Sequence, residues 1–87
     1  MWILHIPRRV ERELADAPAP LRSSLEQAIE QLRHDPRPVG CKKLKGRLQC
    51  WRIRVGSYRI LYDVHDPQRT IASLKIGPRK DVYRFLR

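Results

Sequence analysis

Two runs of alternating residues, separated by a short turn, constrain the fold of this chain most strongly. Residues 50–55 alternate polar and apolar side chains, residues 58–64 do the same, and Gly56 and Ser57 stand between them. Alternation with a period of two is typical of a strand with one buried face. A two-residue loop that begins with glycine favours a type II′ turn. The segment therefore predicts an antiparallel β-hairpin.

The two-residue loop also fixes the register of this hairpin. The predicted pairs are Val55–Tyr58, Arg54–Arg59, Ile53–Ile60, Arg52–Leu61 and Trp51–Tyr62. Three apolar pairs then share one face, and a slip of one residue would turn them all to solvent, so the register is strongly specified. Arg52, Arg54 and Arg59 share the other face. Like charges held directly opposite each other are destabilising, and we interpret them as a preorganised cationic face for phosphate groups.

Helical patterns precede the hairpin. Residues 2–6 predict a short strand, and residues 8–16 a short helix that is followed by a proline-containing linker. A second helix is expected from about Pro20 to Arg33, and Asp35 before Pro36 ends it. Its apolar residues recur at helical spacing, at Leu21, Leu25, Ala28, Ile29 and Leu32.

The rest of the chain is expected to complete a small sheet. Residues 37–49 predict a loop, and residues 70–76 a strand that turns Ala72, Leu74 and Ile76 inward and is broken at Gly77 and Pro78. Residues 79–87 predict a short tail or helix. The fold class is α+β with the order βααβββ. We expect one domain over residues 1–87, a mostly antiparallel four-stranded sheet with two helices on one face.

The positive charge of the chain is concentrated in one block. The net charge is +10 over 87 residues, and residues 37–62 hold eight basic and no acidic side chains. A basic block on ordered structure predicts a polyanionic partner. The acidic residues fall mainly on the predicted helices and are interpreted as solvated. No apolar run reaches the roughly 20 residues of a membrane span.

Cofactor and metal chemistry have little support in the sequence. The two cysteines and three histidines lack metal-ligand spacing. We therefore expect a soluble cytoplasmic protein without a metal or cofactor.

Three motifs together resemble the RelE/ParE toxin superfamily of type II toxin–antitoxin systems. They are residues 42–46 (KKLKG), 51–62 (WRIRVGSYRILY) and 75–84 (KIGPRKDVYR). The resemblance covers essentially the whole chain and implies a βααβββ fold. It also implies neutralisation by an antitoxin encoded nearby, in a hetero-oligomer. In the RelE branch it implies a ribosome-dependent endoribonuclease that cuts messenger RNA in the ribosomal A site.

The resemblance also implies a set of site residues. By position, the catalytic residues fall on Arg52, Arg54, Arg59, Arg79 and Tyr83. The residues interpreted as binding RNA or the ribosome are Lys42, Lys43, Lys45, Arg47, Lys75 and Lys80. Several relatives have lysine where this chain has Arg52 and Arg54, and histidine or lysine where it has Pro78.

The assignment leaves open which group transfers the proton. Arginine stays protonated and is a poor general base, which leaves Tyr83 to stack on a base or to carry a proton. Tyr83 could instead be a core aromatic that packs with Val82 or Leu86. Two other functions stay open: a ParE-like toxin that binds DNA gyrase without catalysis, and an inactive relic that binds only its antitoxin.

Overall fold

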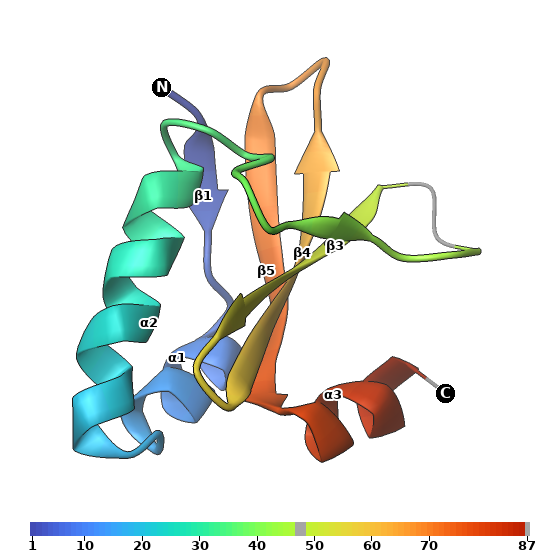
Figure 1. Cartoon of the computed structure of the whole chain (residues 1–87). Coiled ribbons are helices and arrows are strands. Elements are labelled where there is room, and N and C mark those ends of the chain that lie inside the picture. Colours follow the sequence, from blue (N-terminus) through green and yellow to red (C-terminus); the bar gives the residue numbers. More distant parts are fainter. Residues whose placement is uncertain (47–48, 87) are drawn as a thin grey trace.

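The computed structural model describes residues 1–46 and 49–86, which form five strands and three helices (Figure 1). The elements are β1 (Ile3–His5), α1 (Arg8–Ala15), α2 (Ala19–Leu32), β2 (Lys42–Lys43), β3 (Cys50–Val55), β4 (Tyr58–His65), β5 (Thr70–Pro78) and α3 (Arg79–Leu86). The strands form one sheet in the order β1-β5-β4-β3-β2. β1 runs parallel to β5, and the other neighbours are antiparallel. The predicted α+β class is confirmed.

The β3–β4 hairpin has the predicted register. The pairs are Val55–Tyr58, Arg54–Arg59, Ile53–Ile60, Arg52–Leu61 and Trp51–Tyr62, as the two-residue loop requires. Gly56 has a φ of 59°, whereas Ser57 is not among the described residues with positive φ. This combination fits a type II′ turn and excludes type I′. The arginines of both strands therefore lie on the face opposite the apolar pairs.

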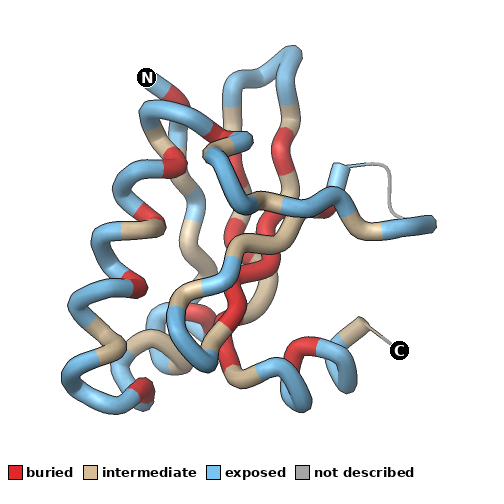
Figure 2. The backbone as a smooth tube through the Cα atoms, viewed as in Figure 1, coloured by how far each residue is buried: buried red, intermediate tan, exposed pale blue. Residues whose placement is uncertain are grey.

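The main core lies between α2 and the sheet (Figures 1 and 2). Leu25, Ile29 and Leu32 of α2 are buried, in agreement with the predicted helical stripe. They belong to one cluster with Ile60 and Tyr62 of β4. The buried Tyr62 hydroxyl donates a hydrogen bond of 2.9 Å to the Pro36 carbonyl oxygen, which satisfies the only polar atom of that side chain. The apolar face of the hairpin therefore meets the helices, as the register predicts.

The other side of the sheet is partly covered by α3. This helix lies away from α2 (Figure 1) and contacts β4 and β5. Val82 of α3 is fully buried, and so is Leu61, which faces this side of β4. Among the described residues, no helix has the length and apolar character that crossing a membrane requires.

The predicted strand count was wrong by one. Residues 37–49 were expected to form a loop, but Lys42 and Lys43 pair with Arg52 and Trp51 as β2. A strand of two lysines carries no alternation of apolar and polar residues, so its sequence has no strand signal. Lysine is a typical residue of an edge strand because its charge discourages pairing with further chains. β2 therefore completes the sheet without extending the core.

The predicted inward face of β5 is confirmed for Ile76 but was wrong for Ala72 and Leu74, because the strand contains a β-bulge. Leu61 pairs with Lys75, but its neighbour Tyr62 pairs with Ser73, which leaves Leu74 as an extra residue. The bulge reverses the alternation, so Ile71, Ser73 and Ile76 are buried and Leu74 is only partly buried. Residues 77 and 78 do not break the strand, since they pair with Arg59 and Tyr58.

We predict that Gly56, in the turn of the β3–β4 hairpin, tolerates no side chain. A Cβ atom on Gly56 would lie 2.9 Å from Leu21 Cδ1, whereas one on Gly46 (φ 77°) would meet nothing within 4 Å. Gly46→Ala should lower the free energy of unfolding by about 1 kcal/mol through backbone strain. Gly56→Ala should lower it by roughly a further 1 kcal/mol because the Leu21 side chain must also move out of its packed position. Urea denaturation measures both, and equal losses would contradict a turn packed against α2.

Candidate functional site

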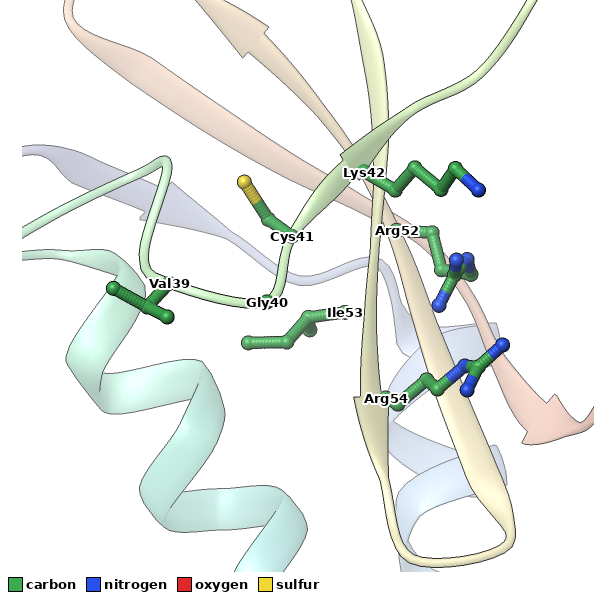
Figure 3. A pocket seen from close by; sticks show the side chains of 7 residues that line it. All are labelled: Val39, Gly40, Cys41, Lys42, Arg52, Ile53 and Arg54. Atoms are coloured by element: carbon green, nitrogen blue, oxygen red, sulfur yellow. The ribbon is translucent and has the colours of Figure 1, made fainter.

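The five residues predicted to be catalytic come from three elements that meet on one face of the sheet. Arg52 and Arg54 project from β3 on the side away from α2, whereas Ile53 between them points toward it (Figure 3). Arg59 pairs with Arg54 in β4 and with Gly77 in β5. Because β5 ends at Pro78, α3 begins beside Arg59 and contributes two further side chains, Arg79 and Tyr83. We call Arg52, Arg54, Arg59, Arg79 and Tyr83 the arginine cluster.

Arg59 is the buried centre of the arginine cluster. Its exposed fraction is 8%, and its Nε atom is buried without a hydrogen-bond partner among the described residues. Burial lowers the pKa of its guanidinium and the charge of Arg54 lowers it further, with smaller contributions from Arg52 and Arg79, whereas Tyr83 raises it. A buried, unpaired cation is expensive unless an anion neutralises it. The site is therefore built to receive a negatively charged group.

Tyr83 is an exposed member of the arginine cluster and not a core aromatic. Its exposed fraction is 43%, whereas the adjacent Val82 is fully buried, so the core-packing alternative was wrong. The Arg79 guanidinium carbon lies 5.1 Å from the centre of its ring. A hydrogen bond and the charge of Arg79 lower the pKa of the Tyr83 phenol, with smaller contributions from Arg59 and Arg52. The phenol can therefore release a proton more readily than an isolated tyrosine.

The residues predicted to bind RNA have different surroundings. Lys42, Lys43, Lys45 and Lys80 are exposed. Lys75 is half-buried, and its Nζ donates a hydrogen bond of 2.8 Å to Glu13 Oε2, so the structure holds this ammonium in an ion pair. Arg47 lies outside the described residues. The cationic surface around the arginine cluster therefore depends on β2 and α3 more than on β5.

A groove of about 640 Å³ adjoins the arginine cluster. Its lining residues are Val39, Gly40, Cys41, Lys42, Arg52, Ile53 and Arg54 (Figure 3). The sequence analysis identified the arginines but not the wall formed by residues 39–41. The only local signal there is Gly40, whose φ of 94° favours glycine.

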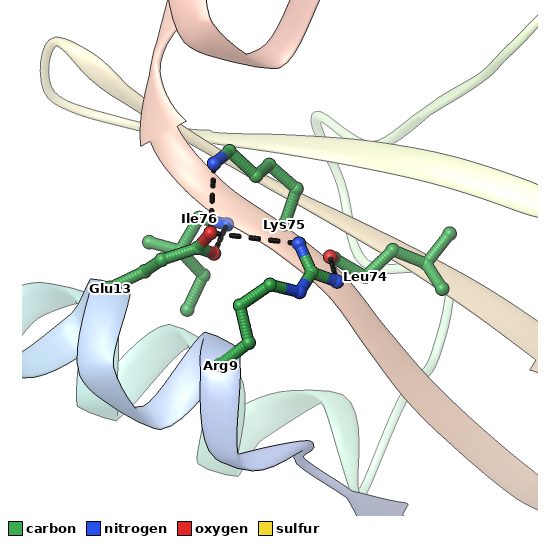
Figure 4. A network of polar contacts seen from close by, with 5 residues as sticks. All are labelled: Arg9, Glu13, Leu74, Lys75 and Ile76. Atoms are coloured by element: carbon green, nitrogen blue, oxygen red, sulfur yellow. Dashed lines mark hydrogen bonds and ion pairs between the residues drawn. The ribbon is translucent and has the colours of Figure 1, made fainter. Parts of the chain in front are cut away.

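Two side chains of α1 support the strand that leads to α3, and the sequence analysis missed both. β1 pairs with β5 only at residues 70–72, so within the described part of the chain no strand lies beside the remainder of this edge of β5. There Glu13 Oε1 accepts a hydrogen bond of 2.9 Å from the Ile76 amide, and the Leu74 carbonyl accepts one of 2.7 Å from Arg9 (Figure 4). The interpretation of the acidic residues as solvated was therefore wrong for Glu13.

The chemistry available to the site comes from guanidinium and phenol groups. Guanidinium groups bind phosphate oxygens bidentately and stabilise developing negative charge. The Tyr83 hydroxyl can donate or accept a proton. Among residues 1–46 and 49–86, no group of three His, Cys, Asp or Glu side chains could hold a metal ion.

Comparisons with known proteins agree that this chain is similar to toxins. Residues 3–83 match the family model described as the ParE toxin of the type II toxin–antitoxin system parDE. RelE1, a candidate toxin of Methanocaldococcus jannaschii, is 32% identical over 84 residues, which cover 93% of each chain. Toxin RelG of Mycobacterium tuberculosis is 35% identical over 68 residues, 77% of each chain.

A solved structure extends this likeness to the fold. The archaeal RelE–RelB complex from Pyrococcus horikoshii aligns with a TM-score of 0.79 and 26% identity. The alignment covers 90% of this chain and 94% of that chain.

We predict that Arg59 lowers the stability of the free protein. Arg59→Met replaces the arginine with an unbranched apolar side chain and so removes the buried, unpaired charge. It should raise the free energy of unfolding by about 1–2 kcal/mol. Arg12→Met, on the exposed side of α1, should change it by less than about 0.5 kcal/mol. Chemical denaturation in a buffer without phosphate measures both, and a loss of stability in Arg59→Met would contradict the argument.

We further predict the order in which two tyrosines ionise. Burial is the main cause that raises the pKa of Tyr62, whereas Arg79 lowers that of Tyr83. Tyr83 should therefore ionise at lower pH than Tyr62 in a titration followed by the tyrosine ¹³Cζ resonances. Arg79→Gln should move the Tyr83 midpoint to higher pH, because the phenolate loses a cationic partner. An unchanged Tyr83 midpoint in Arg79→Gln would show that Arg79 does not lower the pKa of this phenol.

Proposed function

This chain belongs to the ParE toxin family of type II toxin–antitoxin systems and is a toxin of the RelE type, on which basis we propose that it is an endoribonuclease that cleaves messenger RNA in the ribosomal A site and thereby inhibits translation. The observation that carries the proposal is the buried, unpaired Arg59 at the centre of the arginine cluster. The unpaired cation lowers the stability of the free protein, so its presence is best explained by a ligand that neutralises it, and a phosphate accepts the paired hydrogen bonds that guanidinium groups donate.

The proposed reaction uses the RNA itself as the nucleophile. The 2′-oxygen gives up its proton and attacks the adjacent phosphorus, the bond from phosphorus to the 5′-oxygen breaks, and the leaving 5′-oxygen takes up a proton from solvent. The products end in a 2′,3′-cyclic phosphate and a 5′-hydroxyl. Arg59 and its neighbours hold the phosphate in line and stabilise the charge that develops on its oxygens. No metal ion is required for these steps.

The proton from the 2′-hydroxyl needs an acceptor that is not an arginine. A guanidinium has a pKa above about 12 and stays protonated. Tyr83 has the suitable chemistry, because Arg79 lowers the pKa of its phenol and its ring is exposed to a ligand. We assign proton transfer or base stacking to Tyr83, and binding and charge stabilisation to Arg52, Arg54, Arg59 and Arg79.

The proposed partners follow from the same family. The Pyrococcus horikoshii relative was solved as a RelE–RelB complex. We infer that a cognate antitoxin binds and neutralises this chain in a hetero-oligomer. The exposed lysines Lys42, Lys43, Lys45 and Lys80 would contact ribosomal RNA in the cytoplasm.

We keep the binding of DNA gyrase as a second candidate function, because the matching family model is named for ParE. A ParE-like toxin would bind DNA gyrase and stop replication without cleaving RNA. An inactive relic would do neither. Expression of the chain in cells, with separate labelling of new protein and new DNA, distinguishes the three. Arrest of protein synthesis before DNA synthesis supports the proposed function, and the reverse order supports the second.

We predict two distinct effects on RNA cleavage. Purified protein is incubated with programmed ribosomes under single-turnover conditions, and primer extension maps the new messenger RNA ends. Tyr83→Phe should slow cleavage by about 10²-fold if the phenol transfers a proton, with nearly unchanged binding. Arg59→Ala should weaken binding and slow cleavage by about 10²–10³-fold.

The exposed Arg12→Ala variant of α1 serves as the control and should cleave at the rate of the unaltered protein. Unchanged cleavage by Tyr83→Phe would eliminate its role in proton transfer. Absence of new messenger RNA ends with the unaltered protein would reject the proposed function.

A further inference from the structure

The groove beside the arginine cluster crosses a free edge of the sheet. β2 pairs with β3 only through Lys42 and Lys43, so Arg54 has no β2 partner. Gly40, with a φ of 94°, lies where the loop that precedes β2 runs away from β3 (Figure 3). The space left between this loop and β3 is the groove of about 640 Å³. Pockets of roughly 300–1,000 Å³ typically hold small ligands.

The two sides of the groove differ in chemistry. Lys42, Arg52 and Arg54 project on the side of the arginine cluster, and none of the described lining residues is acidic (Figure 3). Val39 and Ile53 lie toward the opposite side, and the side chain of Val39 is fully exposed. A fitting occupant is therefore anionic at one end and has an apolar face at the other. A nucleotide, with its phosphate and its base, has this combination.

The wall formed by residues 39–41 is held in place from outside the groove. Arg37, two residues before Val39, donates hydrogen bonds of 2.7 and 3.2 Å to both carboxylate oxygens of Asp66. Its guanidinium carbon also lies 5.1 Å from the centre of the Trp51 ring. The loop is thereby tied to the β4–β5 turn and to β3. The groove is consequently formed before any ligand arrives, which reduces the entropy that binding costs.

The groove is continuous with the arginine cluster, because Arg52 and Arg54 belong to both. A single strand of RNA with one phosphate at Arg59 would therefore continue into the groove. We propose that the groove is a second nucleotide subsite, which holds the nucleotide next to the one that carries the scissile phosphate. This proposal rests on the proposed function and adds to it the place where the enzyme contacts a neighbouring base.

The test compares a short and a long ligand on the full chain by NMR. The ligands are uridine 3′-monophosphate and a 2′-O-methylated triuridylate, which cannot be cleaved because its 2′-oxygens are blocked. The mononucleotide should shift the amide of Gly77, which pairs with Arg59. The trinucleotide should shift the Gly77 amide and, in addition, the amides of Gly40 and Cys41. It should also bind about tenfold more tightly, because a second base gains contacts.

A matched pair of variants tests the groove itself. Val39→Glu places a negative charge on the exposed wall of the groove. Ile3→Glu makes the same change on an exposed β-branched residue of β1, at the opposite edge of the sheet. Val39→Glu should weaken trinucleotide binding by about tenfold, because a charged carboxylate replaces the apolar contact that the second base would make. It should change mononucleotide binding by less than twofold, and Ile3→Glu should change either ligand by less than twofold.

The outcomes separate this proposal from the proposed function. If Arg59→Ala abolishes binding of both ligands but Gly40 and Cys41 do not respond to the trinucleotide, the subsite is rejected and the phosphate site stands. Equal effects of Val39→Glu and Ile3→Glu reject the subsite as well. Binding of both ligands that does not depend on Arg59, or no binding of either, contradicts both proposals. A response of Gly40 and Cys41 to purified antitoxin but not to RNA would identify the groove as a protein contact and overturn the subsite.

Discussion

The two-residue turn at Gly56 and Ser57 is the constraint on which the rest of the structure depends. It fixes the register of β3 and β4, and the register decides which side chains face α2. Once the apolar pairs are buried, Arg52, Arg54 and Arg59 must share the opposite face. The burial of three apolar pairs therefore holds together three like charges that would otherwise separate. Stability of the core and concentration of charge are two consequences of one register.

Among the residues that the structure describes, some positively charged side chains are paired with carboxylates, whereas those of the arginine cluster are not. Arg37 is paired with Asp66, and Lys75 is paired with Glu13. The arginine cluster is different, because Arg59 is buried there and the charge that acts on it most strongly is that of another arginine, Arg54. A carboxylate at this place would stabilise the free protein, but it would also occupy the position of the ligand. The unpaired charge is therefore better explained by function than by folding, since preorganised cations act on a phosphate without rearrangement.

The sequence predicts those parts of the fold that depend on local periodicity. The register of the hairpin and the buried stripe of α2 follow from spacing alone, and both are confirmed. The bulge at Leu74 could not be predicted, because it depends on how β5 pairs with β4. β2 could not be predicted either, since its two lysines form a strand only because Trp51 and Arg52 lie beside them.

The site, like the fold, could be predicted only in the part that depends on local periodicity. The arginines of the hairpin follow from the register, but Arg79 and Tyr83 were assigned through a family resemblance, because a sequence does not reveal where a terminal segment packs. Glu13 shows the limit most clearly. On its helix it lies four residues from Arg9 and looks like half of a surface ion pair, yet it binds an amide and a lysine of a strand more than 60 residues away. Such a role depends on the tertiary fold alone.

The position of Tyr83 depends on contacts far from the arginine cluster. α3 begins where β5 ends, so the placement of its side chains depends on the last residues of that strand. Glu13 binds the amide of Ile76, and Arg9 binds Leu74 while its guanidinium carbon lies 5.2 Å from the Phe85 ring of α3. α1 thus fixes both the strand that precedes α3 and one side of the helix itself. An arginine-rich site can bind a phosphate with some tolerance of geometry, because each guanidinium offers several donors. Proton transfer is less tolerant, since the phenol must lie within hydrogen-bond distance of one oxygen. The network from α1 therefore matters most for Tyr83, the one member of the arginine cluster that is not a permanent cation.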